Sequence, residues 1–162
     1  MLRIKFVLFN FFVFLSTVVY AQQAKTLAAI RITDAPVVDG LLLENIWKTL
    51  PPADDFTLIW PATRSGMKIP EGYETTAYIA YDKKAIYVGA KLLHPTPSLI
   101  PKEFSERDNI WDVNAETFFV SINTYNDDLN FFSFQVTSAG TIGDSYSSGP
   151  IQGVDYNYDT VY

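Results

Sequence analysis

Short extended segments separated by turn residues constrain the fold of this chain more than any other feature of its sequence. Between residues 29 and 145, runs rich in β-branched and aromatic side chains recur between clusters of Gly, Pro, Asn and Asp. Such runs are typical of β-strands, and a spacing of about 8–12 residues is typical of sandwich folds. The predicted strands are residues 29–32, 36–38, 75–81, 85–93, 116–123, 131–137 and 141–145. We therefore predict an all-β fold, an antiparallel β-sandwich.

One short helix is predicted near the N-terminus of the sandwich. Leu43, Ile46, Trp47 and Leu50 recur at the spacing that places side chains on one face of a helix. Two prolines follow directly and end the pattern. We expect a two-turn helix over residues 42–49, with Trp47 in the core.

The N-terminus has the pattern of a secretory signal peptide. Two basic residues precede an almost wholly apolar run at 6–19, and small residues occupy the cleavage positions that end with Ala21. The run is shorter than the roughly 20 residues of a membrane-spanning helix, so cleavage is favoured over a retained anchor. We expect residues 1–21 to be a signal peptide, residues 22–31 a tether and residues 32–162 the sandwich. The protein would then be exported to the periplasm, the outer membrane or the cell surface.

Charge and cysteine content exclude several classes of function. The first 21 residues hold two of the twelve basic residues and none of the eighteen acidic ones. Residues 22–162 therefore carry ten basic and eighteen acidic residues, a formal net charge of −8. An acidic surface without a basic cluster repels nucleic acid, so we exclude that partner. The absence of cysteine excludes disulfides, thiolate zinc sites and thiol catalysis, so the domain must rest on its core, to which bound metal can add.

The last residues read as part of another strand. Tyrosines at 156, 158 and 162 alternate with other residues, and no turn follows them. We expect the sandwich to be truncated there and this chain to be the leading module of a longer protein.

Five motifs in order resemble family 9 carbohydrate-binding modules. They are Asp39-Gly40 with Leu43, Glu44 and Trp47; the hairpin at 78–89; Arg107-Asp108 with the acidic strand start at 112–119; Asn130, Phe134 and Val136; and Gly140 with Asp144. Similar modules lead large exported proteins with a long β-rich region, expected to be an outer-membrane barrel. Others are attached to xylanases and further glycoside hydrolases. The resemblance implies polysaccharide or oligosaccharide as partner, a link to polysaccharide breakdown, and structural calcium.

Exposed aromatic and forked polar side chains are the candidates for binding sugar. A pyranose ring stacks its apolar face on aromatic rings and offers its hydroxyls to planar polar groups. Trp111 lies in a long polar loop at 95–112, and Trp60 precedes a proline in an irregular segment. Either tryptophan has a second interpretation, as a lid over a sheet edge. Arg107, with Asp108, would contact sugar hydroxyls or else form an ion pair that holds the loop. The resemblance adds Tyr158, where the family has an aromatic residue.

Alternating oxygen ligands are the candidates for binding metal. Asp112, Asn114 and Glu116 share a face of an extended segment and are of the type that calcium prefers. A second cluster lies in the turn at 126–130. Either cluster can equally be a solvated acidic turn.

No spacing singles out a pair of carboxylates for glycoside hydrolysis, so we predict a module without catalytic activity. The predicted function is carbohydrate binding. The alternative is a structural N-terminal module of an outer-membrane β-barrel protein that binds no sugar.

Overall fold

The computed structural model describes residues 25–149 and 153–160. The predicted signal peptide, the start of the predicted tether and the last two residues of the predicted sandwich lie outside the described residues. None of the helices in the described ranges has the length and apolar character that crossing a membrane requires.

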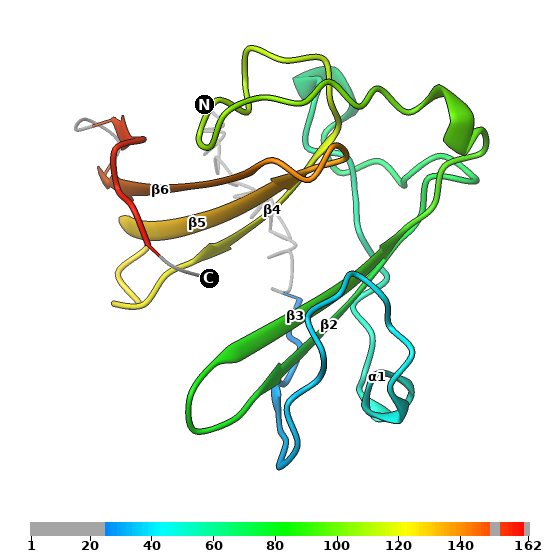
Figure 1. Cartoon of the computed structure of the whole chain (residues 1–162). Helices are drawn as coiled ribbons and strands as arrows, with labels where there is room; N and C mark the ends of the chain where they lie inside the picture. Colours follow the sequence, from blue (N-terminus) through cyan, green and yellow to red (C-terminus); the bar gives the residue numbers. More distant parts are fainter. Residues whose placement is uncertain (1–24, 150–152, 161–162) are drawn as a thin grey trace, which may run out of the picture.

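Two β-sheets with very little helix make up the described molecule (Figure 1). The first sheet has the order β1 (Ile30–Arg31), β2 (Thr75–Tyr81) and β3 (Ile86–Leu92). The second has the order β4 (Thr117–Ile122), β5 (Asn130–Thr137), β6 (Ile142–Ser148) and β7 (Val154–Asp155). The predicted all-β sandwich-like fold is therefore confirmed.

The first sheet departs from a wholly antiparallel order. β1 pairs in parallel with β2, whereas β2–β3 and the pairs of the second sheet are antiparallel. Parallel neighbours need a long crossover connection, and more than forty residues separate β1 from β2. This crossover contains the helix α1 (Asn45–Thr49) and the short 3₁₀ helix η1 (Ala62–Arg64); a second, η2 (Pro97–Leu99), follows β3.

The helix predicted at 42–49 exists but begins later, at Asn45. Glu44 keeps an extended backbone because its carboxylate accepts hydrogen bonds from the backbone N–H of Val37 (2.9 Å) and from Trp47 Nε1 (3.0 Å). These bonds hold the preceding segment outside the helix. Trp47 is buried against β2 and β3, as predicted, in a cluster with Ile32, Leu50 and Ala80.

Two predicted strands are wrong. Residues 36–38 form no strand, and the strand expected at 156–162 is replaced within the described residues by β7 at Val154–Asp155 followed by a turn. The Asp155 carboxylate accepts a hydrogen bond from the backbone N–H of Asn157 (2.9 Å), which closes this turn. Alternating tyrosines therefore do not extend the strand here.

The two faces of the second sheet differ in polarity. Residues that pair across antiparallel strands point to the same face. One face is largely apolar and carries Phe118, Val120, Ile122, Phe132 and Phe134. The opposite face is largely polar and carries Phe119, Ser133, Gln135, Ser145 and Ser147.

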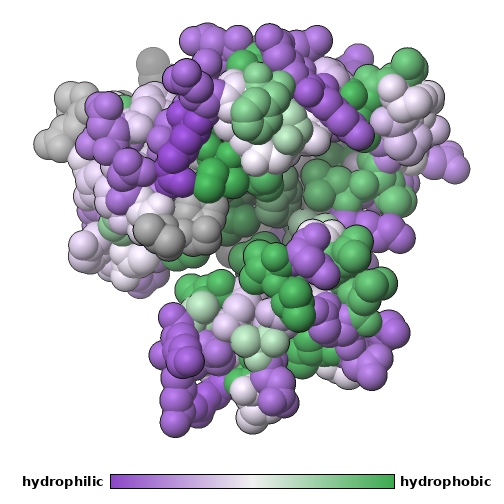
Figure 2. Space-filling model, in the orientation of Figure 1, coloured by the Kyte–Doolittle hydropathy of each residue, from purple (hydrophilic) through white to green (hydrophobic). Residues whose placement is uncertain are grey.

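Apolar side chains remain exposed on the first sheet as well. Ile86, Val88 and Leu92 of β3 share one face of the sheet with Tyr81 of β2, and all four are exposed. Figure 2 shows apolar atoms gathered where the upper and lower parts of the molecule meet, around a hollow between them. Each sheet therefore leaves apolar surface open toward this hollow or toward solvent.

Candidate functional site

A shallow groove lies on the polar face of the second sheet. Its volume is about 130 Å³. The lining residues come from all four strands and from two flanking segments: Trp111, Phe119, Ser133, Gln135, Ser145, Ser147, Val154 and Tyr156. Because register places the strand residues on one face, they form a continuous floor, whereas Trp111 and Tyr156 come from outside the strands.

The floor offers hydrogen-bonding groups and the flanking segments offer aromatic surface. Gln135 and Ser145 are buried, and Gln135 Nε2 donates a hydrogen bond to Ser145 Oγ (3.3 Å). Hydroxyl groups can both donate and accept, and a side-chain amide does each with a separate atom. Trp111 and Tyr156 are 59% and 44% exposed, so both rings present apolar surface to a ligand. The arrangement can accept a small ligand that has both an apolar patch and hydroxyl groups.

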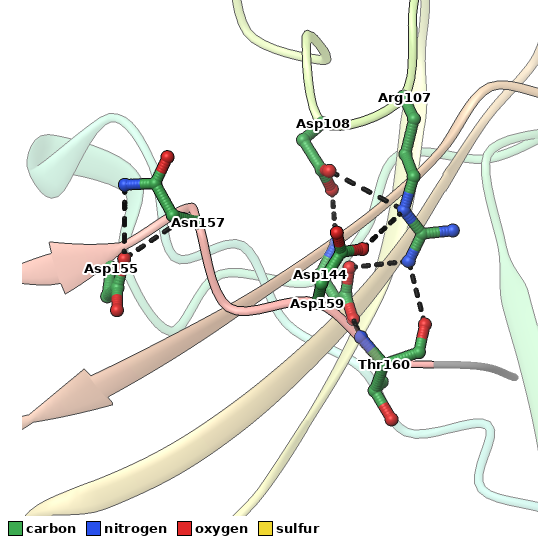
Figure 3. Close-up of polar contacts among 7 residues, drawn as sticks. All are labelled: Arg107, Asp108, Asp144, Asp155, Asn157, Asp159 and Thr160. Carbon is green, nitrogen blue, oxygen red and sulfur yellow. Dashed lines mark hydrogen bonds and ion pairs between the residues drawn. The ribbon is translucent and has the colours of Figure 1, made fainter.

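Arg107 holds the loop before β4 against the second sheet (Figure 3). Arg107 Nη2 donates to Asp144 Oδ1 (2.7 Å) and to the carbonyl oxygen of Thr160 (2.9 Å), while Arg107 Nε donates to Asp159 Oδ1 (3.0 Å). Asp108 Oδ2 lies 3.5 Å from Arg107 Nε. We call these four charged residues, Arg107, Asp108, Asp144 and Asp159, the Arg107 cluster.

Asp108 joins the loop to β6 by its backbone and its side chain. Its backbone N–H donates to the carbonyl of Ile142 (3.1 Å), and its Oδ1 accepts from the backbone N–H of Asp144 (2.9 Å). Asp108 has a left-handed backbone (φ 65°). A Cβ on Gly143 would lie 3.3 Å from Asp108 Oδ1, so glycine there allows the close approach of the loop.

Charge in the Arg107 cluster is strongly paired. Partial burial acts to lower the pKa of Arg107, but the hydrogen bond and charge of Asp144, with the charges of Asp108 and Asp159, outweigh it and raise that pKa above its ordinary value. The side chain of Asp144 is fully buried, so removing Arg107 would leave this carboxylate without its ion-pair partner in the interior.

The three aspartates of the Arg107 cluster could also hold a metal ion. One carboxylate oxygen from each of Asp108, Asp144 and Asp159 lies within 4.8 Å of the others. Carboxylate oxygens suit hard cations such as calcium. This set was not predicted from the sequence, because Asp144 and Asp159 are far from Asp108 along the chain and only the pairing of β6 with its neighbours brings them together.

The predicted sugar-binding residues separate into four places. Trp111 lines the groove, whereas Arg107 and Asp108 lie in the Arg107 cluster. Trp60 is 79% exposed, in the segment before η1, and does not line the groove. The ring centroid of Tyr158 lies 5.4 Å from that of Phe132 and 6.2 Å from that of Tyr146. Tyr158 therefore packs on the face of the sheet opposite to the groove.

The predicted metal ligands Asp112, Asn114 and Glu116 are all exposed. The backbone N–H of Asn114 donates to Glu103 Oε2 (2.8 Å). Glu116 Oε1 lies 4.0 Å from Nε2 of His94, the only histidine of the sequence. The metal site at these residues stays a prediction.

The second acidic cluster forms a turn. Asp127 Oδ1 accepts from the backbone N–H groups of Leu129 and Asn130 (both 3.0 Å), and these bonds lower the pKa of Asp127. Asn126 and Asp128 have left-handed backbones, as a tight turn requires. The contacts within this cluster are those of a structural turn.

Tyr156 and the polar floor of the groove were also not predicted from the sequence. Ser133 and Gln135 alternate with phenylalanines on β5, and Ser145 and Ser147 alternate with larger residues on β6. This period of two was the available signal for a polar sheet face.

Comparisons with models of protein families, with curated proteins and with solved structures found no match to this chain. The resemblance to family 9 carbohydrate-binding modules therefore stays an expectation that rests on the sequence motifs.

Proposed function

We propose that this chain is a non-catalytic carbohydrate-binding module of an exported protein. The observation that supports the proposal best is the groove, in which the exposed rings of Trp111 and Tyr156 lie beside a floor of hydroxyl and amide groups. Its ligand would be a polysaccharide or an oligosaccharide, and binding would raise the local concentration of the parent protein at a glycan surface.

The chemistry of the groove matches that of a sugar ring. One side of a pyranose ring is an apolar patch of C–H groups, which stacks on aromatic rings, and its edge carries hydroxyls. Ser133, Gln135, Ser145 and Ser147 supply donors and acceptors for these hydroxyls. Glycoside hydrolysis commonly uses two carboxylates, and among the residues that the structure describes none of those lining the groove is a carboxylate, so the function that we propose is binding without cleavage.

Replacing Trp111 tests the proposal directly. We expect Trp111→Ala to weaken retention in native gels that contain soluble xylan or hydroxyethyl cellulose by at least about tenfold, roughly 1.4 kcal/mol, because the main stacking surface is lost.

Trp60→Ala is the matched control, since it removes a more exposed tryptophan that lies outside the groove. Its retention should equal that of the unmodified chain. Circular dichroism would show that both variants keep their β-structure. Equal retention of Trp111→Ala and the unmodified chain would rule out the groove as the sugar site.

A structural module without a sugar site is the second candidate function. It is favoured by the exposed apolar residues on one face of the first sheet, including Ile86, Val88 and Leu92, because large apolar patches commonly mark sites of contact with another protein surface. A glycan array separates the two candidates: signals on plant or microbial polysaccharides support the first, and silence across the array supports the second.

Calcium is the ion that we propose for the carboxylates of the Arg107 cluster. Calcium binding there should raise the melting temperature, and a chelator should reverse the change. A melting temperature that neither calcium nor chelator alters would contradict this part of the proposal.

A further inference from the structure

We infer that Arg107 is a positioning residue, which holds both segments that bring aromatic rings to the groove. The consequence for ligand binding rests on the proposed function, whereas the geometric role does not.

The first segment that Arg107 holds is the loop that ends in Trp111. Arg107 Nη2 donates to the buried Asp144 of β6 (2.7 Å), and the next residue, Asp108, bonds β6 through both backbone and side chain. Ile110, at 2% exposed, lies close to Gly143 of the same strand. Trp111 follows directly in sequence, so the position of its backbone over the sheet is set by these contacts.

A further pair of hydrogen bonds supports the start of this loop. The Ser105 backbone N–H donates to Thr141 Oγ1 (3.2 Å), and the same hydroxyl donates to the Ser105 carbonyl (3.2 Å). Ser105, Arg107, Asp108 and Ile110 thus each contact residues 141–144, although residues 105–110 form no regular element.

The second segment is the stretch after β7 that contains Tyr156. β7 has two residues, and its pairing with β6 covers only Asp155 and Val154. Arg107 adds bonds to Asp159 Oδ1 (3.0 Å) and to the carbonyl of Thr160 (2.9 Å), and the Thr160 N–H donates to Asp144 Oδ2 (2.7 Å). Tyr156 therefore lies between two attachment points, one at β6 and one at Arg107.

One guanidinium joins the two segments because it presents several donors in a fixed plane. Arg107 reaches a carboxylate on β6, a carboxylate after β7 and a backbone carbonyl at the same time. Lysine has the charge but lacks this planar fork, so it cannot reproduce the same set of contacts. The separation between the Trp111 and Tyr156 segments should therefore depend on arginine at this position.

The test measures this separation without any ligand. The chain contains no cysteine, so Asp112→Cys with Asn157→Cys provides two spin-label sites, each next to one aromatic residue of the groove. We call this doubly labelled chain the parent. Pulsed electron–electron double resonance should give one narrow distribution of the distance between its two labels. We expect Arg107→Gln and Arg107→Lys to broaden it, whereas Arg64→Gln, at an exposed arginine in η1, should leave it narrow.

A milder variant keeps the test valid if the Arg107 variants fail to fold. Asp159 is 75% exposed at its side chain, so Asp159→Asn removes the charge of one surface partner of Arg107 and should broaden the distribution to a smaller extent. Glu106→Gln is its control, because Glu106 is exposed and precedes Arg107 in sequence but lies outside the Arg107 cluster. A broad distribution in the parent would overturn the inference. So would a narrow distribution in every folded Arg107 variant, or, if none of these folds, a narrow distribution in Asp159→Asn.

Binding to xylan is measured separately on unlabelled chains that retain Asp112 and Asn157. Losing the preorganisation of two aromatic side chains should weaken binding about tenfold in Arg107→Lys. If the distribution is narrow in the parent and broad in the Arg107 variants but no glycan binds, the proposed function fails and the positioning role of Arg107 stands. If xylan binds but the distances do not change in the Arg107 variants, the positioning role fails alone.

Discussion

Gly89 shows how a single missing side chain allows the helix to lie on the first sheet. A Cβ at this position would lie 2.8 Å from Leu42 Cδ2 and 2.9 Å from Trp47 Cζ3. Both distances are shorter than the contacts that a Cβ makes with carbon atoms to which it is not bonded. We expect Gly89→Ala to push the helix segment away from β3 and to lower the free energy of unfolding by about 1–3 kcal/mol, the usual cost of overpacking. Urea unfolding followed by tryptophan fluorescence measures this change.

The double variant Leu42→Ala with Gly89→Ala is the control for this explanation. Because Leu42→Ala removes one of the clashing atoms, the cost of Gly89→Ala should be smaller in that background than in the unmodified chain. Equal costs in the two backgrounds would contradict a clash with Leu42.

Single residues were predicted from the sequence where their own pattern decided the outcome. Trp47 lies on a helical stripe and is buried, as predicted. Trp111 lies among polar residues and is exposed, but its role in binding sugar stays a prediction. Arg107 had two open interpretations, and only the structure shows its ion pair with Asp144, because strand β6 must first pair in register with β5 to bring Asp144 to the loop. The sequence holds no local signal for such a contact.

At the scale of elements, the turn of the β2–β3 hairpin depends on one carboxylate. Asp82 Oδ1 accepts from the backbone N–H groups of Lys84 (2.6 Å) and Ala85 (2.8 Å), and Oδ2 accepts from the Tyr87 hydroxyl (3.1 Å). The backbone bond from Lys84 is the largest cause that lowers the pKa of Asp82. This contribution to stability is therefore complete above the unfolded-state pKa and is lost as the pH falls through the lower, folded-state pKa.

We expect Asp82→Asn to destabilise the hairpin at neutral pH and to flatten part of the loss of stability that the unmodified chain shows on acidification. Denaturant unfolding between neutral pH and about pH 3, on either side of the ordinary aspartate pKa, measures both effects. Asp54→Asn, at an exposed aspartate outside the hairpin, should leave the pH profile unchanged. Parallel profiles for Asp82→Asn and the unmodified chain would show that the carboxylate has no such role.

Elements with a clear local pattern were predicted well. The hairpin strands expected at 75–81 and 85–93 are observed at Thr75–Tyr81 and Ile86–Leu92, because alternation and the Asp82 turn act together. The strand expected at 141–145 extends to Ser148, where pairing with β5 continues beyond the apolar pattern. The helix was predicted three residues too early, since the sequence does not show that Glu44 binds Val37.

Across the whole described molecule, the two sheets are stabilised by different means. The main buried apolar cluster, with Trp47 and Ala80 at its centre, belongs to the first sheet and its helix. The second sheet is held at one end by the Arg107 cluster, which joins a loop, β6 and the segment after β7. Regions with separate sets of stabilising contacts can open separately, with different free energies.

We therefore expect the two sheets to lose protection against amide hydrogen exchange independently. Gly89→Ala should speed exchange in β2 and β3 while β4, β5 and β6 stay protected, because its clash lies in the cluster around Trp47. Arg107→Gln should speed exchange in the second sheet while β2 and β3 stay protected, because the bonds it removes to Asp144, Asp159 and Thr160 lie at β6 and in the segment after β7. Exchange resolved by peptide mass spectrometry measures both changes in one experiment. If either variant speeds exchange equally in both sheets, they unfold as one cooperative unit, and the exposed apolar faces of the two sheets must then be coupled more tightly than their separate stabilising contacts indicate.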